Sequence, residues 1–211
     1  AYLPGEVIDV SNPPNPQRVG SFTNGGWDVA VSGNYAYLAR GTDGLEVIDV
    51  SNPANPQRVG VTFDVDKCWR VAVEGNYAYV ADEWYGLVVF DVSNPANPQR
   101  VGRYFTGGAQ DVAVSGNYAF VANDDTGLQV IDVSNPARPY RVGFYNTTGS
   151  AWGVAVSGDF AYVADYDAGL QVIDVSIPFN PQRVGRYETN LFAVDVVVSG
   201  NYAYVAELFF G

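Results

Sequence analysis

The segment Val-Ile-Asp-Val-Ser-Asn-Pro decides the fold of this chain because it recurs along the sequence at a nearly constant spacing. It is intact at Val7–Pro13, Val47–Pro53 and Val130–Pro136, and it has small changes at Val89–Pro95 and Val172–Pro178. Its aspartate stands at positions 9, 49, 91, 132 and 174, in steps of 40, 42, 41 and 42 residues. A repeat of this length predicts a fold of similar structural units, each packed against its neighbours. We therefore interpret residues 1–211 as a single repeat domain.

The composition excludes several classes of protein. The 23 acidic and 11 basic residues give a formal net charge of −12, which disfavours nucleic acid and anionic membranes because both require a basic surface. The chain has no histidine and a single cysteine, Cys68. It therefore cannot form an intrachain disulfide, and it lacks the residue most used for acid–base catalysis and zinc binding. No apolar run reaches the length of a transmembrane helix, so membrane insertion is not expected.

Each unit contains four short stretches rich in Val, Tyr, Ile and Phe. In the third unit they lie near residues 110–115, 118–122, 128–133 and 141–146. Such runs, bounded by Gly, Asn and Pro, predict strands, and Gly116-Asn117 between the first two suits a tight hairpin turn. No segment has convincing helical periodicity. Each unit is therefore predicted to be a four-stranded antiparallel meander, as in the blade of a β-propeller.

The two ends of the chain supply incomplete units. Residues 6–10 and 18–23 correspond to the third and fourth strands of a unit, and residues 194–198 and 202–206 to the first and second. Joined, they would complete one more unit and remove free sheet edges. We predict an all-β fold, namely a five-bladed β-propeller whose closing blade is shared by the N- and C-termini, with two strands from each. A fragment of a longer propeller is the structural alternative.

Two longer stretches carry a resemblance to a known family. Gly-Leu-Gln-Val-Ile-Asp-Val-Ser-Asn-Pro occurs at residues 127–136, and variants of Val-Ala-Val-Ser-Gly-Asn-Tyr-Ala-Tyr-Val-Ala occur in the first half of the units. The pattern resembles the LVIVD repeat family, and only the connection at Ser176-Ile177-Pro178 departs from it. The resemblance implies a β-propeller, typically in bacterial or archaeal proteins that are exported or displayed on the surface, and it carries no catalytic motif. We therefore expect an extracellular or cell-surface location.

Two charged positions are constant from unit to unit. The third strand carries an aspartate and the fourth strand an arginine, once in every unit. Because a ligand site requires asymmetry, we interpret both as scaffold and expect an Asp–Arg or Asp–backbone contact repeated five times. The positions are Asp9, Asp49, Asp91, Asp132 and Asp174, and Arg18, Arg58, Arg100, Arg141 and Arg183.

The connections between strands fall into a constant and a variable set. The connections from the second to the third strand, and from the fourth strand to the next unit, differ between units and share one face of the predicted disc. We call it the variable face, and loops on a rigid scaffold are where functional residues concentrate. Its acidic and aromatic residues favour a carbohydrate or a cation, although Asp is also favoured in turns and Trp can cap a core. The candidate ligand-binding residues are Trp27, Asp43, Asp66, Trp69, Asp82, Trp84, Tyr85, Asp124, Asp125, Trp152, Asp165, Tyr166, Asp167 and Phe192.

Calcium is the metal that the acidic pairs of the variable face suggest. The weak candidates are Asp124, Asp125, Asp165 and Asp167, and neither pair has the ligand spacing of an EF-hand. The metal therefore stays unknown, and apart from calcium no cofactor is expected.

A glycosidase-like site is the enzymatic alternative. Asp28, Asp111 and Asp195 occupy one register of the first strand near the predicted axis, where paired carboxylates could act as acid and base. The same position holds Arg70 and Gly153 in other units, so it is again a repeat position. We therefore do not expect an enzyme.

The first functional hypothesis is a non-enzymatic, exported interaction or structural module with a protein or carbohydrate partner. A carbohydrate-binding module that uses the variable face is the second, and a glycosidase-like enzyme is the third. The ends suggest homo-assembly, because Ala1-Tyr2-Leu3 repeats a second-strand sequence that Ala203–Val205 already supplies. Such a surplus strand could pair along a neighbour's sheet edge, with Leu208, Phe209 and Phe210 buried in the contact. Frayed ends are the alternative.

Overall fold

The computed structural model describes residues 5–22 and 25–209, and within them all regular secondary structure is β-strand. The strands form four four-stranded antiparallel sheets and two two-stranded sheets. The all-β prediction and the four-stranded meander are therefore confirmed. Ala1–Leu3 and Phe210, on which part of the assembly hypothesis rests, lie outside the described residues.

We call each four-stranded sheet a blade and number the blades along the chain. The first blade contains β3 (Asp28–Ser32), β4 (Tyr35–Ala39), β5 (Leu45–Asp49) and β6 (Gln57–Thr62). The second contains β7 (Cys68–Glu74), β8 (Tyr77–Asp82), β9 (Gly86–Asp91) and β10 (Gln99–Tyr104). The third contains β11 (Asp111–Ser115), β12 (Tyr118–Ala122), β13 (Leu128–Asp132) and β14 (Tyr140–Tyr145). The fourth contains β15 (Gly153–Ser157), β16 (Phe160–Ala164), β17 (Leu170–Asp174) and β18 (Gln182–Tyr187).

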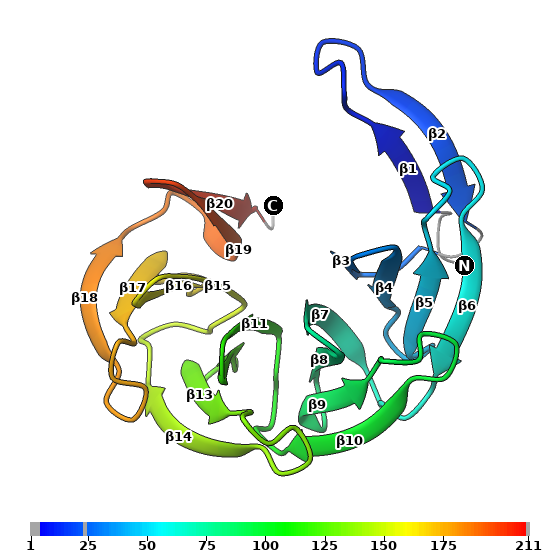
Figure 1. Ribbon diagram of the computed structural model, residues 1–211. Coiled ribbons are helices and arrows are strands. Elements are labelled where there is room, and N and C mark those ends of the chain that lie inside the picture. The colour runs from blue at the N-terminus through cyan, green and yellow to red at the C-terminus, as the bar shows by residue number, and fades with distance from the viewer. Residues whose placement is uncertain (1–4, 23–24, 210–211) are drawn as a thin grey trace.

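The blades stand side by side around a common axis (Figure 1). The first strand of each blade lies innermost and the fourth lies at the rim, and each innermost strand contacts that of the next blade. Apolar side chains fill the space between consecutive blades. Phe90 and Val88 of the second blade, for example, share one buried cluster with Val47 of the first. Complete burial of such a side chain stabilises the fold by roughly 1.5–3 kcal/mol, so the core is distributed over the interfaces between blades.

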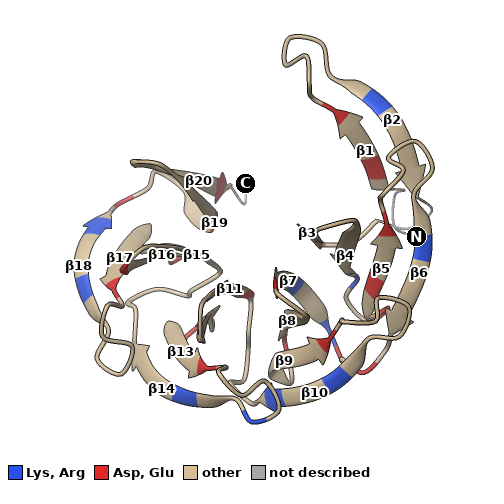
Figure 2. Ribbon diagram, in the orientation of Figure 1, with Lys and Arg blue, Asp and Glu red and all other residues tan. Residues whose placement is uncertain are grey.

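The constant aspartates take the role predicted for them. In each unit the carboxylate Oδ1 accepts a hydrogen bond of 2.8–2.9 Å from the backbone N–H of the serine two residues later. Hydrogen bonds to this serine lower the pKa of all five carboxyls. The arginines lie on the rim strands, coloured blue in Figure 2. The Asp–backbone contact repeated five times is thus confirmed.

A glycine on each rim strand allows the next blade to approach closely. A Cβ atom at Gly60 or Gly102 would lie 2.1 or 2.0 Å from the carbonyl oxygen of Pro95 or Pro136, in the third-to-fourth-strand loop of the following blade. Gly20 and Gly143 have the same relation to Pro53 and Pro178. The repeated glycine is therefore explained by the packing of blade against blade.

The two ends of the chain do not form the predicted shared blade in this structure. The amino-terminal hairpin, β1 (Gly5–Asp9) and β2 (Gln17–Phe22), and the carboxy-terminal hairpin, β19 (Phe192–Ser199) and β20 (Tyr202–Leu208), are separate two-stranded sheets. The arc of blades is open between them (Figure 1). The physical reason is that each hairpin is held by its own neighbour: Phe22 packs on the first blade, and Val205 packs with Leu170 of the fourth.

The opening leaves repeat positions uncovered. Val29 is 54% exposed, whereas Val71, Val112 and Val154 at the same position are each 5% exposed. A Cβ atom at Gly185 would meet only Val172, at 3.6 Å, where the other rim-strand glycines meet a proline carbonyl. The unpaired edges of β1 and β20 are thus accompanied by unfilled packing positions.

Candidate ligand-binding site on the variable face

The innermost strands begin around a cavity of 320 Å³ at the axis, which we call the mouth cavity. Three candidate residues, Trp27, Trp69 and Trp152, line it, each just before or at the start of a blade's first strand. Because these strands converge on the axis, one sequence position repeated in three units places three indole side chains around the same cavity. The other lining residues are Arg70, Gln110, Val194 and Leu208.

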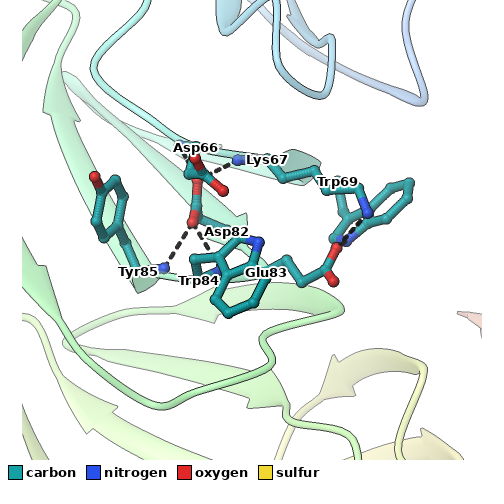
Figure 3. A network of polar contacts seen from close by, with 7 residues as sticks. All are labelled: Asp66, Lys67, Trp69, Asp82, Glu83, Trp84 and Tyr85. Carbon is teal, nitrogen blue, oxygen red and sulfur yellow. Dashed lines mark hydrogen bonds and ion pairs between the residues drawn. The ribbon is translucent and has the colours of Figure 1, made fainter.

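Contacts on the second blade fix one wall of the mouth cavity. Trp69 packs edge-on against Trp27 with ring centroids 5.1 Å apart, and its Nε1–H donates a 3.1 Å hydrogen bond to Glu83. Lys67 forms an ion pair of 2.6 Å with Glu83, and its ammonium lies 4.5 Å from the centre of the Trp69 ring. Figure 3 shows Lys67, Trp69 and Glu83 in this arrangement. The Trp69 ring is therefore held in place before any ligand arrives.

A stack of three aromatic rings lies on the opposite side of the axis. Trp152 stacks on Tyr166 with centroids 5.3 Å apart, and Tyr166 stacks on Phe192 at 4.3 Å. The backbone of Tyr166 has a positive φ of 47° and exchanges hydrogen bonds with Ala193. Three candidate residues are thus brought together, with Trp152 as the member that faces the mouth cavity.

Asp82, a candidate ligand-binding residue, lies buried beneath the loops of the variable face. Its side chain is fully buried. Oδ2 accepts hydrogen bonds from the backbone N–H groups of Asp66 (2.7 Å) and Lys67 (2.9 Å), and Oδ1 from those of Trp84 (3.0 Å) and Tyr85 (2.7 Å). Figure 3 shows Asp82 between these two loops. The carboxylate thus joins two connections of the variable face.

The same repeat position has the same role in later units. Asn123 donates from Nδ2 to the carbonyls of Thr106 (3.2 Å) and Gly107 (2.8 Å). Asp165, also buried, accepts from the backbone N–H of Gly149 at 3.0 Å and from the Thr147 hydroxyl. Burial raises the pKa of the Asp165 carboxyl, and the Thr147 hydrogen bond opposes the shift. This position therefore shapes the variable face from within.

The remaining candidates are spread over the variable face. Asp43 pairs with Arg40 at 3.3 Å. The Tyr85 ring lies 5.3 Å from the Arg103 guanidinium and packs against the core. The side chains of Asp66 and Asp167 are exposed, and Asp125 accepts a 3.1 Å hydrogen bond from Ser150. Trp84 and Asp124 line a second cavity, described below.

Below the mouth, the axial strands line an open cavity of 390 Å³, and Asp28, Arg70, Asp111 and Asp195 are among its lining residues. Asp28 and Asp111 each accept a hydrogen bond from a valine N–H on another blade, Val71 at 2.9 Å and Val154 at 2.8 Å. Asp195 pairs with Arg70 at 3.6 Å. Burial raises the pKa of Asp111 to about 7, against the lowering effect of the Val154 hydrogen bond. Two of the three acids thus connect neighbouring innermost strands.

No group of three or more His, Cys, Asp or Glu side chains that could hold a metal ion occurs in residues 5–22 and 25–209. Cys68 is buried, and burial raises the pKa of its thiol. In the same described ranges, no helix is long and apolar enough to cross a membrane.

Arg70, Gln110, Leu208 and Phe105 are site residues that sequence reasoning missed. Gln110 occupies the tryptophan position in the third blade, and Arg70 directly follows it in the second. Aligning the units with one another could therefore have found both. Leu208 was assigned to self-assembly, and the structure places it in the mouth cavity. Phe105 had no signal apart from its variability between units.

The arc of repeated antiparallel blades around an axis, with variable loops on one face, defines a repeat protein with the blade arrangement of a β-propeller. A family model described as "LVIVD repeat" matches residues 6–24, 26–62, 67–106, 106–147, 148–189 and 192–208. The chain belongs to the LVIVD repeat family, which confirms the resemblance read from its motifs. No curated protein matches the chain.

Solved structures show the same fold at low sequence identity. A functionally unknown protein from Desulfotomaculum acetoxidans DSM 771 is 15% identical with a TM-score of 0.77, and the match covers 90% of this chain and 66% of that one. The computationally designed Ika8 protein is 10% identical with a TM-score of 0.69, and the match covers 85% and 54%. This chain therefore spans between about half and two-thirds of the length of these two proteins.

Proposed function

We propose that this protein is a non-enzymatic binding module that takes an uncharged carbohydrate at the mouth cavity. The observation that carries the proposal is the convergence of Trp27, Trp69 and Trp152 on one cavity. Indole faces can pack against the C–H faces of a sugar ring, and Gln110 and Arg70 offer hydrogen-bond donors to its hydroxyl groups. A few polar groups in a mainly apolar, preformed cavity are typical of small-ligand sites.

The contacts of the axial carboxylates support a structural role. Backbone N–H groups of neighbouring strands donate to Asp28 and Asp111, and Asp195 is paired with Arg70. These contacts account for the three carboxylates without a catalytic role.

A location outside the cell is part of the proposal, because proteins with this repeat are typically exported or displayed on the surface. Cell-surface or matrix polysaccharides are the carbohydrates that such a location offers. A protein partner is the alternative occupant of the variable face.

A glycan array tests the proposal with four proteins: the unchanged chain, Trp69→Ala, Trp152→Ala and the control Phe179→Ala. Phe179 is 75% exposed in a third-to-fourth-strand loop, away from the variable face. We expect neutral glycans to bind the unchanged chain and the control, and both tryptophan variants to lose about tenfold or more, as for a hot-spot residue. Equal binding by all four, or no bound glycan, contradicts the proposal. Release of new reducing ends would favour the glycosidase alternative.

We further propose that the terminal hairpins pair in solution and close the ring as a five-bladed propeller. The intact blades supply the register. In the first blade β4 pairs with β5 through Tyr35–Asp49 and Tyr37–Val47, which corresponds to Tyr202–Asp9 and Tyr204–Val7 between β20 and β1. Tyr204 is 58% exposed, whereas Tyr37 at the same position is 4% exposed. Closure would therefore bury a side chain whose equivalents Tyr37, Tyr79 and Phe120 are buried in the first three blades.

Disulfide trapping tests the closure. A chain carrying Val7→Cys and Tyr204→Cys should form an intrachain disulfide, because directly opposed antiparallel residues have the required Cα separation of about 4.5–5.5 Å. Val10→Cys with Tyr204→Cys is the out-of-register control. Cys68 is buried and should not compete. Disulfide-linked dimers from the first pair would mean that the edges join two copies, and reduced monomers from both pairs would mean that the arc stays open.

A further inference from the structure

Three cavities on the variable face share lining residues in sequence from the axis to the rim. Gln110 lines both the mouth cavity and a cavity of 340 Å³ between the second and third blades, which we call the inter-blade cleft. Phe105 lines both this cleft and a cavity of 240 Å³ further out, which we call the rim groove. The shared residues make the three cavities neighbours along one radial path.

The inter-blade cleft has aromatic walls and a floor without side chains. Trp84 and Phe105 are 62% and 72% exposed and both line the cleft. The floor is Gly107-Gly108, with φ of 69° and 89°. Positive φ favours glycine, and the two glycines line the cleft without adding a side chain to it.

The walls of the cleft are fixed by hydrogen bonds between loops. The backbone N–H of Gly108 donates to the Glu83 carbonyl at 3.0 Å, and that of Asp124 donates to the Ala151 carbonyl at 3.1 Å. Asn123 holds the Thr106-Gly107 segment through two further hydrogen bonds. A cleft held in this way loses little conformational entropy when a ligand binds.

Polar groups of both kinds accompany the aromatic rings. Glu83 and Asp124 line the cleft, and burial together with the neighbouring Asp125 raises the pKa of Asp124. In the rim groove Arg141 donates to Gln129 at 2.9 Å and lies 4.9 Å from the centre of the Phe144 ring. Acids, an arginine and amides along one path disfavour a strongly charged polymer of either sign and suit hydroxyl groups, which both donate and accept.

We propose that an extended, uncharged oligosaccharide lies along this path, with sugar units at the mouth cavity, the inter-blade cleft and the rim groove. This deepens the proposed function and rests on it. Each cavity contributes at least one aromatic platform: Trp69 at the mouth, Trp84 in the cleft and Phe144 in the groove. With successive subsites, the protein would bind several consecutive sugar units of a polysaccharide chain.

The test is calorimetric titration of the intact chain with mono-, di-, tetra- and hexasaccharides of β-1,4-linked glucose, β-1,4-linked xylose and β-1,4-linked N-acetylglucosamine. In at least one series the affinity should rise with chain length. Trp84→Ala should remove about tenfold or more of the hexasaccharide affinity and leave the disaccharide affinity unchanged. Trp69→Ala should weaken both. Trp84 does not line the mouth cavity, so its replacement keeps the first subsite.

The outcomes separate the two proposals. Affinity that is independent of length, or a hexasaccharide affinity that Trp84→Ala leaves unchanged, overturns the extended site while binding at the mouth stands. No binding in any series overturns both. If an uncharged peptide binds along the path and no sugar does, the path is real but the ligand class is wrong, and the proposal is overturned as stated.

Discussion

Alanine substitutions of the rim-strand glycines test both the packing of the blades and the closure of the ring. In Gly102→Ala the new Cβ atom would lie 2.0 Å from the carbonyl oxygen of Pro136, well inside van der Waals contact. The backbone of one blade must shift, and overpacking of this kind typically costs about 1–3 kcal/mol. Glycine to alanine in a strand otherwise tends to stabilise, so any loss of stability is attributable to the clash.

Gly185→Ala is the informative partner of this substitution. In the open arc its Cβ would meet only Val172 at 3.6 Å, an ordinary contact, and the free energy of unfolding would hardly change. If the ring closes as proposed, the loop at Pro13 takes the place that Pro136 has beside Gly102. Gly185→Ala should then cost about 1–3 kcal/mol as well.

Urea unfolding, followed by tryptophan fluorescence, gives the free energies, and thermal melting gives a second measure. For a domain of this size each kcal/mol lowers the Tm by about 2–4 °C. Gly116→Ala is a control for conformational cost alone, because it has a φ of 57° and no atom within 4 Å of its Cβ position. A neutral Gly102→Ala would refute the packing argument. A neutral Gly185→Ala beside a destabilising Gly102→Ala would refute closure and leave the packing intact.

Three further outcomes follow from the structure. Asp82→Ala should lower the free energy of unfolding by about 2–4 kcal/mol, because it leaves four loop N–H groups without their acceptor. Replacement of the exposed Asp66 by alanine should change stability by less than about 0.5 kcal/mol. Urea unfolding compares the two variants, and equal costs would contradict the assigned role of Asp82. The pKa of Asp111 is about 7 in the folded state and about 3.9 in the unfolded state. Its contribution to the free energy of unfolding is therefore complete below pH 4 and is lost as the pH rises through 7. Asp111→Asn should flatten this decline in stability between pH 5 and 8, and an unchanged pH profile would show that the carboxyl titrates normally. Phe209 is 73% exposed near the carboxy-terminal end. If this end mediates homo-assembly, Phe209→Ser should reduce the mass measured by light scattering to that of a monomer. An unchanged mass would contradict the homo-assembly hypothesis.

The scaffold was predictable because every structural requirement is repeated five times. Asp132 and its four equivalents could be recognised as structural from their constancy, and their hydrogen bonds to serine agree. The meander followed from turn residues such as Gly116, whose φ is 57°. The relation between the two ends was less predictable, because the sequence shows that β1 and β20 are complementary but not whether the edges meet.

The candidate site was only partly predictable because residue type does not reveal what a side chain contacts. Asp82 and Asp165 looked like ligands, yet loops with few backbone partners need internal acceptors, and these two carboxylates supply them. The three axial tryptophans were found because they repeat. Phe105 and Gln110 were missed because their importance arises from neighbours about 20–40 residues away in the sequence, such as Trp84 and Trp152.

The radial path lies at the boundary between the second and third blades, where the variable loops differ in sequence from those of the other units. Between the third and fourth blades, Ser150 stands near the position of Gly108, and its hydroxyl donates to Asp125 at 3.1 Å. Beyond the fourth blade, the stacked rings of Tyr166 and Phe192, 4.3 Å apart, occupy the equivalent region. Between the second and third blades, Gly107 and Gly108 line a cleft together with the exposed rings of Trp84 and Phe105. A repeated scaffold can therefore acquire a directional site through a few substitutions in its variable loops, and binding would be sought first at this boundary.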